Sequence, residues 1–203
     1  MARTITHIVP ILAGALLLAS CVSLGAKAPP SMLLLTATAA VADGTSKVAP
    51  VADALVISMP DSPRKLETNR VPVQIDASNL AYLKDAVWTD KPARLMQQLL
   101  MEVVAARNNV LVLNEPVTGG RAGSVVAGQL IEFGLDARTN QAVVVYDAIL
   151  LRSGQPVEKR RFEARENVST LLPVPAGAAL NRAANTVADS VAKWLAAPVK
   201  GNG

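Results

Sequence analysis

Residues 142–166 read AVVVYDAILLRSGQPVEKRRFEARE, and they are the most informative part of the chain. The first ten of them, residues 142–151, are apolar on both faces, which is typical of a central strand. A turn signature follows at residues 153–156, and the charged residues 157–166 suit a strand at the edge of a sheet. The segment therefore predicts a hairpin of one central and one edge strand.

A third long strand is predicted immediately before this hairpin, at residues 125–135. A turn at residues 136–140 would join it to the central strand. Because side chains alternate along a strand, we expect four of its residues to share one face. These residues are Gln129, Ile131, Phe133 and Leu135.

Shorter apolar runs predict the strands of the first half of the chain. Pro72 demotes the run at residues 70–75 to an edge or bulged strand. Residues 80–88 predict an irregular strand or loop, and residues 37–52 a loose surface loop. Further strands are expected at residues 32–36, 54–59 and 110–113.

Two helices are predicted from apolar side chains that recur at helical spacing. The first is capped by Thr89 or Asp90, has Pro92 in its first turn and ends near residues 107–109. Its apolar stripe is Leu95, Met96, Leu99, Leu100, Val103 and Val104, with Arg94, Gln97, Gln98 and Glu102 on the opposite side. The second covers residues 176–197, after Pro173 and Pro175. Its stripe is Leu180, Ala184, Val187, Val191, Trp194 and Leu195.

Together these elements predict the fold class. It is α/β, a mixed β-sheet with two main helices packed on it, in a single domain at residues 32–197. Hydrophobic residues make up 51% of the 203 residues, which excludes general disorder. Aromatic residues make up 3% and the net charge of +4 is spread along the chain, so we expect no nucleic-acid partner.

The first twenty residues predict an export signal. Arg3 gives a positive start, and residues 8–19 form an apolar run too short to span a bilayer. Residues 18–21, LASC, resemble the bacterial lipobox, in which the Cys thiol accepts a diacylglyceryl group. We therefore expect a signal peptide at residues 1–20, lipidation at Cys21, a lipidated tether at residues 21–31 and a flexible tail at residues 198–203.

Val22, rather than Asp, follows Cys21, which favours the periplasmic face of the outer membrane in a Gram-negative bacterium. Cleavage would remove His7, the only His, and lipidation would occupy the only Cys. Catalytic triads with His and zinc sites built on Cys or His are then excluded. Ser190 and Lys193 match S-x-x-K, but the sequence lacks the accompanying S-D-N and K-T-G elements. We expect no catalytic residue, no metal and no cofactor.

Several segments in their order along the chain resemble the ABC-type transport auxiliary lipoprotein family. They are residues 66–71 (LETNRV), 80–98, 147–152 (DAILLR), 160–162 (RRF) and 178–194. The family comprises outer-membrane lipoproteins of Pqi-type and other mammalian-cell-entry (MCE) lipid transport systems. The resemblance implies an accessory component that docks an MCE-type substrate-binding protein and, through it, an inner-membrane permease and ATPase. It further implies an apolar cargo such as phospholipid, and self-association as a homo-oligomer.

The charged strand offers candidate docking residues. Lys159, Arg161 and Arg165 would share one face, which either protects a solvated edge or docks an acidic partner or a neighbouring subunit. Two other functions stay open at this point. One is a structural or assembly lipoprotein that scaffolds an outer-membrane complex. The other is a periplasmic hydrolase that uses carboxylates or Ser-Lys chemistry.

Overall fold

A computed structural model describes residues 32–116 and 122–197. The predicted signal peptide, Cys21, the tether and the tail lie outside these residues. No helix within the described ranges is long and apolar enough to cross a membrane. The strands are β1 (Met32–Leu33), β2 (Leu55–Ile57), β3 (Arg70–Gln74), β4 (Leu80–Trp88), β5 (Val112–Leu113), β6 (Ser124–Asp136), β7 (Gln141–Arg152) and β8 (Glu158–Asn167). The helices are α1 (Pro92–Asn108), α2 (Pro173–Ala196) and two 3-10 turns, η1 (Val51–Asp53) and η2 (Arg64–Leu66).

The sheet is mixed and is built around three long antiparallel strands. β7 lies between β6 and β8 and pairs with both. On its other side, β6 pairs in parallel with β2 near its beginning and with β3 near its end. β5 continues the sheet beyond β2, while β4 and then β1 continue it beyond β3. The predicted α/β fold class, a mixed sheet with two helices in one domain, is confirmed.

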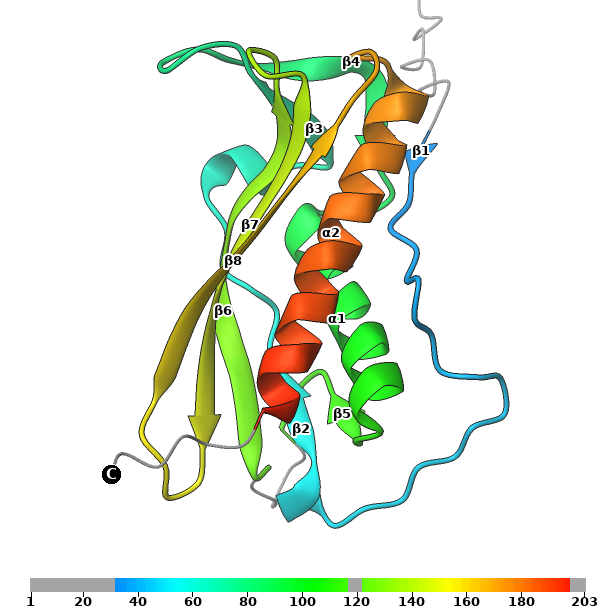
Figure 1. Cartoon of the computed structure of the whole chain (residues 1–203), viewed down its shortest axis with the longest axis vertical. Coiled ribbons are helices and arrows are strands. Elements are labelled where there is room, and N and C mark those ends of the chain that lie inside the picture. The colour runs from blue at the N-terminus through cyan, green and yellow to red at the C-terminus, as the bar shows by residue number, and fades with distance from the viewer. Residues whose placement is uncertain (1–31, 117–121, 198–203) are drawn as a thin grey trace, which may run out of the picture.

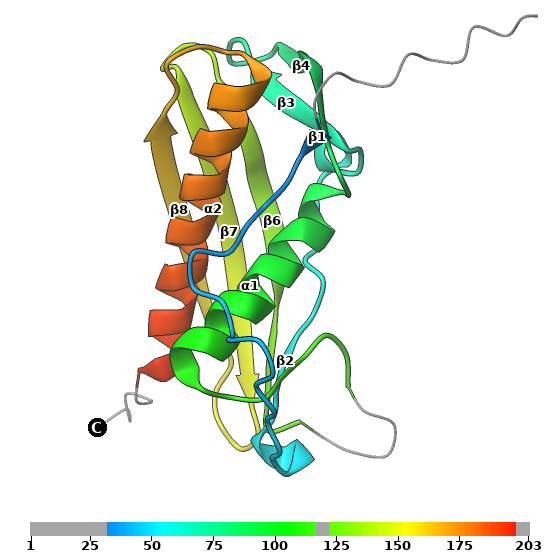
Figure 2. The same ribbon diagram turned by 90° about the vertical axis from the view of Figure 1, so that its right-hand side faces the viewer.

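Both helices cover the same face of the sheet (Figures 1 and 2). All six residues of the predicted α1 stripe are buried, and in the α2 stripe only Leu195 keeps partial exposure. Trp88, Phe133 and Tyr146 are large, fully buried side chains of this core. The rings of Trp88 and Phe133 meet edge to face with centroids 5.2 Å apart, a favourable aromatic geometry. Neither α-helix of the described residues covers the face of β6, β7 and β8 that points away from the core (Figure 1).

Two details of α1 differ from the sequence prediction. The N-cap is Lys91 rather than Thr89 or Asp90, and it forms no side-chain cap bond. Gln97, expected on the solvated side, is buried. Its Nε2 donates a hydrogen bond to the carbonyl oxygen of Ile57 at 2.9 Å, so the amide joins α1 to the end of β2.

A β-bulge in β6 changes which of its side chains face the helices. The register with β7 shifts between Leu130 and Glu132, which leaves Ile131 as the extra residue. A shift of one residue moves the following side chains to the other face of a sheet. Of the four residues expected on one face, the last two therefore face the core, whereas Gln129 is exposed and Ile131 is half-buried.

Prolines mark two further differences. β3 pairs with strands on both sides, so it is not an edge strand. Its register with β4 shifts between Arg70 and Pro72, which confirms the bulged alternative. Pro173 and Pro175 lie inside the first turn of α2, where an amide hydrogen is not needed for the helix, rather than before it.

Residues 34–50 cross the helical layer without helix or strand, and we name this segment the strap (Figure 2). Asn185 of α2, which is only 4% exposed, binds the strap from the helix that lies beneath it. The Nδ2 of Asn185 donates to the carbonyl oxygen of Thr36 at 2.9 Å, and its Oδ1 accepts from the backbone amide of Thr38 at 2.8 Å. Further on, a backbone amide of the strap donates to the carboxylate of Glu102 in α1. The predicted surface loop is therefore fixed to both helices.

Candidate docking surface

The face of β6, β7 and β8 that points away from the helices is the candidate docking surface. Lys159, Arg161 and Arg165 all project from it and are exposed, as the alternation of side chains predicts. Phe162 and Ala164 alternate with them and are buried toward α2. Within the described ranges β8 pairs with β7 alone, so the charged strand lies at an edge of the sheet.

Asp147 in β7 forms ion pairs with two of these cations. Its carboxylate, 8% exposed, accepts hydrogen bonds from two guanidinium nitrogens of Arg161 at 2.6 and 2.9 Å. The Nζ of Lys159 lies 3.3 Å from the same carboxylate. The hydrogen bonds from Arg161 outweigh burial and hold the pKa of Asp147 below its usual value, and they raise the pKa of Arg161. The bidentate pair therefore stays ionised and fixes the direction of the guanidinium.

The third cation, Arg165, also has a partner. It pairs with Glu163 of the same strand at 2.6 Å, and both side chains are about half exposed. With Asp147, two carboxylates thus stand beside three cations, and one net positive charge remains. Arg160 lies on the helix side of β8, with its guanidinium carbon 5.3 Å from the ring centroid of Phe162. The surface is less positive than the sequence alone suggests.

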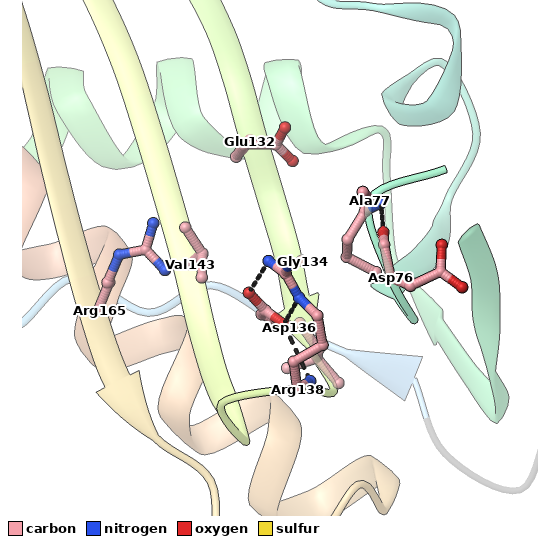
Figure 3. A pocket seen from close by; sticks show the side chains of 10 residues that line it. Asp76, Ala77, Glu132, Gly134, Asp136, Arg138, Val143 and Arg165 are labelled. Carbon is pink, nitrogen blue, oxygen red and sulfur yellow. Dashed lines mark hydrogen bonds and ion pairs between the residues drawn. The ribbon is translucent and has the colours of Figure 1, made fainter. Parts of the chain in front are cut away.

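A hollow of about 360 Å³ opens where this surface approaches the β6–β7 turn (Figure 3). β6 contributes Glu132 and Asp136 to its lining, and β8 contributes Arg165. Gly134, between the two acids, lies against β3. A Cβ there would come within 2.5 Å of the carbonyl oxygen of Pro72, so the close approach of the two strands requires glycine.

The carboxylates of the hollow are held by cations or amides. Asp136 accepts a hydrogen bond from Arg138 at 2.8 Å, and this interaction lowers the pKa of Asp136 to about 2. Asp76 accepts hydrogen bonds within its own turn, from a side-chain amide and then from backbone amides, which lower its pKa as well. Glu132 pairs with Lys65 at 2.5 Å. Since a general acid needs a raised pKa, Asp136 and Asp76 do not support the hydrolase alternative.

Sequence reasoning alone misses the two acids that organise this surface. Asp147 and Asp136 lie inside or at the end of apolar strands, where a single acid has many explanations. Only the strand register, which places Arg161 directly opposite Asp147, identifies the pair. No group of three or more His, Cys, Asp or Glu that could bind a metal ion occurs in residues 32–116 and 122–197.

The chain belongs to the family described as the ABC-type transport auxiliary lipoprotein component, whose model matches residues 33–192. The match extends from the second residue of β1 to the last turns of α2, and so includes β2 to β8 and the whole candidate docking surface. The family assignment made from the sequence is confirmed. The protein is accordingly an auxiliary component of ABC-type transport from a family of lipoproteins. Among curated proteins, no sequence matches the chain significantly.

Two solved structures share this fold. Protein XCC0632 from Xanthomonas campestris, of the DUF330 family, superposes with a TM-score of 0.66 at 19% identity, over 81% of this chain and 94% of its own. The crystal structure of an uncharacterized protein superposes with a TM-score of 0.63 at 13% identity, over 74% of this chain and 96% of that one. At these identities the likeness shows the fold alone.

Proposed function

We propose that the protein is held on the periplasmic face of the outer membrane by acylated Cys21 and acts as an accessory component of an MCE-type lipid transport system. The auxiliary role in ABC-type transport follows from the family. The lipobox at residues 18–21 supports the anchor. The proposed role is to dock an MCE-type substrate-binding protein and, through it, the inner-membrane permease and ATPase, without catalysing a reaction.

The open face of the sheet is the observation that carries the docking role. Its half near the hollow is charged, whereas its half near the β7–β8 turn is apolar apart from Lys159, which lies opposite Ile149 in the pairing of β7 with β8. In that apolar half, Ile149 and Leu151 of β7 stand beside Ala127 and Val125 of β6, and Leu151 is 42% exposed. Protein interfaces typically combine an apolar centre with a polar rim, and this surface has the same composition. A partner with an apolar surface and an acidic border would fit it, because rim charges steer association.

The test is cross-linking and affinity capture from intact envelopes. The informative variant is Lys159→Gln with Arg165→Glu, which removes one exposed charge and reverses another. Arg161 stays unchanged and Lys159 is neutralised rather than reversed, because both lie beside the buried carboxylate of Asp147, and a negative charge at either position would repel it. The matched control is Lys91→Gln with Lys193→Glu, which changes two exposed lysines on the helix side in the same way.

We expect the β8 variant to fold normally and to lose capture of the MCE-type protein, while the control keeps it. Added salt should weaken capture by the wild-type protein. Normal capture by the folded β8 variant would leave only the edge-protecting role of these charges. Capture of outer-membrane assembly proteins instead of transporter parts would favour the scaffold alternative. In a second arm, Cys21→Ala should release the protein from membranes, and retention after a high-salt wash would contradict lipid anchoring.

A further inference from the structure

Of the eleven exposed large hydrophobic side chains among the described residues, six lie at one end of the domain. This end is made by β1, the β3–β4 turn, the β6–β7 turn and the start of α2 (Figure 1). The loop before α2 joins it through a hydrogen bond from the backbone amide of Val168 to the carbonyl oxygen of Asn140 in the β6–β7 turn. The side chains that this end exposes are Met32, Leu34, Ile75, Leu80, Leu172 and Val174.

Four of them surround the point where the described chain begins, and we name them the tether-side patch: Met32, Leu34, Leu172 and Val174. They are 55%, 64%, 59% and 73% exposed, respectively. Their proximity follows from Leu33, whose side chain packs against Gly177 in α2. Val174 precedes Gly177 by one helical turn, so β1 lies beside the first turns of α2 (Figure 2).

The candidate anchor adjoins this end of the domain. Only residues 22–31 stand between Cys21 and Met32 in the sequence. Fully extended, the eleven steps from Cys21 to Met32 span at most about 40 Å. The far end of α2, 24 residues away at a rise of about 1.5 Å each, lies about 36 Å beyond the patch. The tether joins the domain at its apolar end, and the far end of α2 could reach the lipid only if the tether were almost fully extended. A membrane-bound Cys21 would therefore hold the apolar end nearest to the lipid.

We infer that the tether-side patch rests on a lipid surface and inserts its side chains at the membrane interface. This inference rests on the proposed lipid anchoring of Cys21. Moving large apolar side chains out of water is favourable in free energy. When such side chains cluster beside an anchor, the membrane interface can bury them without a protein partner. The contact orients the domain: α2 points away from the membrane, and the apolar half of the docking surface lies at the far end, toward the periplasm.

The experiment places one fluorescent label at either end of the full-length, lipidated protein. Val174→Cys labels the patch, and Val157→Cys is the matched control at the β7–β8 turn, where Val157 is 64% exposed. Both proteins are reconstituted in vesicles of phosphatidylethanolamine and phosphatidylglycerol, with acyl-chain-brominated lipids as quenchers in the bilayer and iodide as the quencher in water. We expect brominated lipid to quench the label at residue 174 and not that at residue 157. Iodide should show the opposite order.

A second measurement keeps the inference falsifiable if the label itself disturbs the contact. Leu172→Ser with Val174→Ser should shift a label at Met32→Cys toward water, with interfacial partitioning about tenfold weaker or more. Equal quenching by iodide at residues 174 and 157 would overturn the inference. So would a label at residue 174 that is shielded from both quenchers, since a second copy or another protein would then cover the patch. If the wild-type protein failed to float with the vesicles, that result would instead contradict the lipid anchor itself.

Discussion

Asp136 is a carboxyl group whose charge contributes to the stability of the fold. Arg138 holds the pKa of Asp136 at about 2, below its usual value near 3.8. Because the pKa is lower in the folded state, the ionised group stabilises the fold above about pH 4. That contribution is lost as the pH falls from about 4 to 2. Asp147 acts in the same direction, since Arg161 also lowers its pKa.

We therefore expect Asp136→Asn to lower the free energy of unfolding at pH 7 and to lower it less at pH 2. Urea unfolding of the wild type and the variant between pH 7 and pH 2 measures this difference. Arg138→Gln removes the partner instead of the acid and should give the same trend. A destabilisation by Asp136→Asn that is equal at pH 7 and pH 2 would show that the charge pair contributes nothing.

The first helix permits a sharper test of packing, because two adjacent positions have opposite surroundings. Leu99 is 4% exposed in the core, whereas Gln98 is exposed. Leu99→Asp should cost several kcal/mol of unfolding free energy, because it buries an unpaired carboxylate. Gln98→Asp should cost about 0.5 kcal/mol or less. Thermal unfolding of both variants measures the difference, and equal losses would contradict the orientation of α1.

The spacing of apolar side chains predicted both helices and the long strands well, because the side chains on one face of each of these elements share one environment. The stripes of α1 and α2 required no tertiary information. The burial of Gln97 could not be predicted, because its buried amide is stabilised by a carbonyl group that is distant in the sequence, that of Ile57. Gln129 and Ile131 were misplaced because a bulge is set by pairing with β7 and has no local sequence signal here.

The candidate docking surface could be predicted only in part for the same reason. Alternation along β8 correctly put Lys159, Arg161 and Arg165 on one face. Their ion pairs depend on the register with β7 and on neighbours within the sheet, which the sequence does not specify. The hollow beside them likewise forms only when the turn after β3 meets the end of β6.

The strap connects the two ends of the molecule. It starts at β1, beside the beginning of α2, and leads to η1 and β2 at the other end (Figure 2). Over this length it has no ladder of backbone hydrogen bonds, so a few side chains of the helices fix its path. Asn185 is the most buried of them and binds the strap as both donor and acceptor. We therefore expect the strap to open locally before the sheet does.

Asn185→Ala should release the first half of the strap while the sheet stays folded. The substitution leaves the groups that Asn185 satisfies without partners, so we expect a loss of about 1–3 kcal/mol of unfolding free energy. Hydrogen exchange should quicken across residues 34–41 and stay slow in β7, which is paired on both sides. Asn181→Ala is the matched control, because the Asn181 side chain accepts only one strap amide, that of Thr36, in a more exposed setting. If both variants leave exchange in the strap unchanged, its path is set by contacts other than these amides, and Asn185 is only a satisfied core residue.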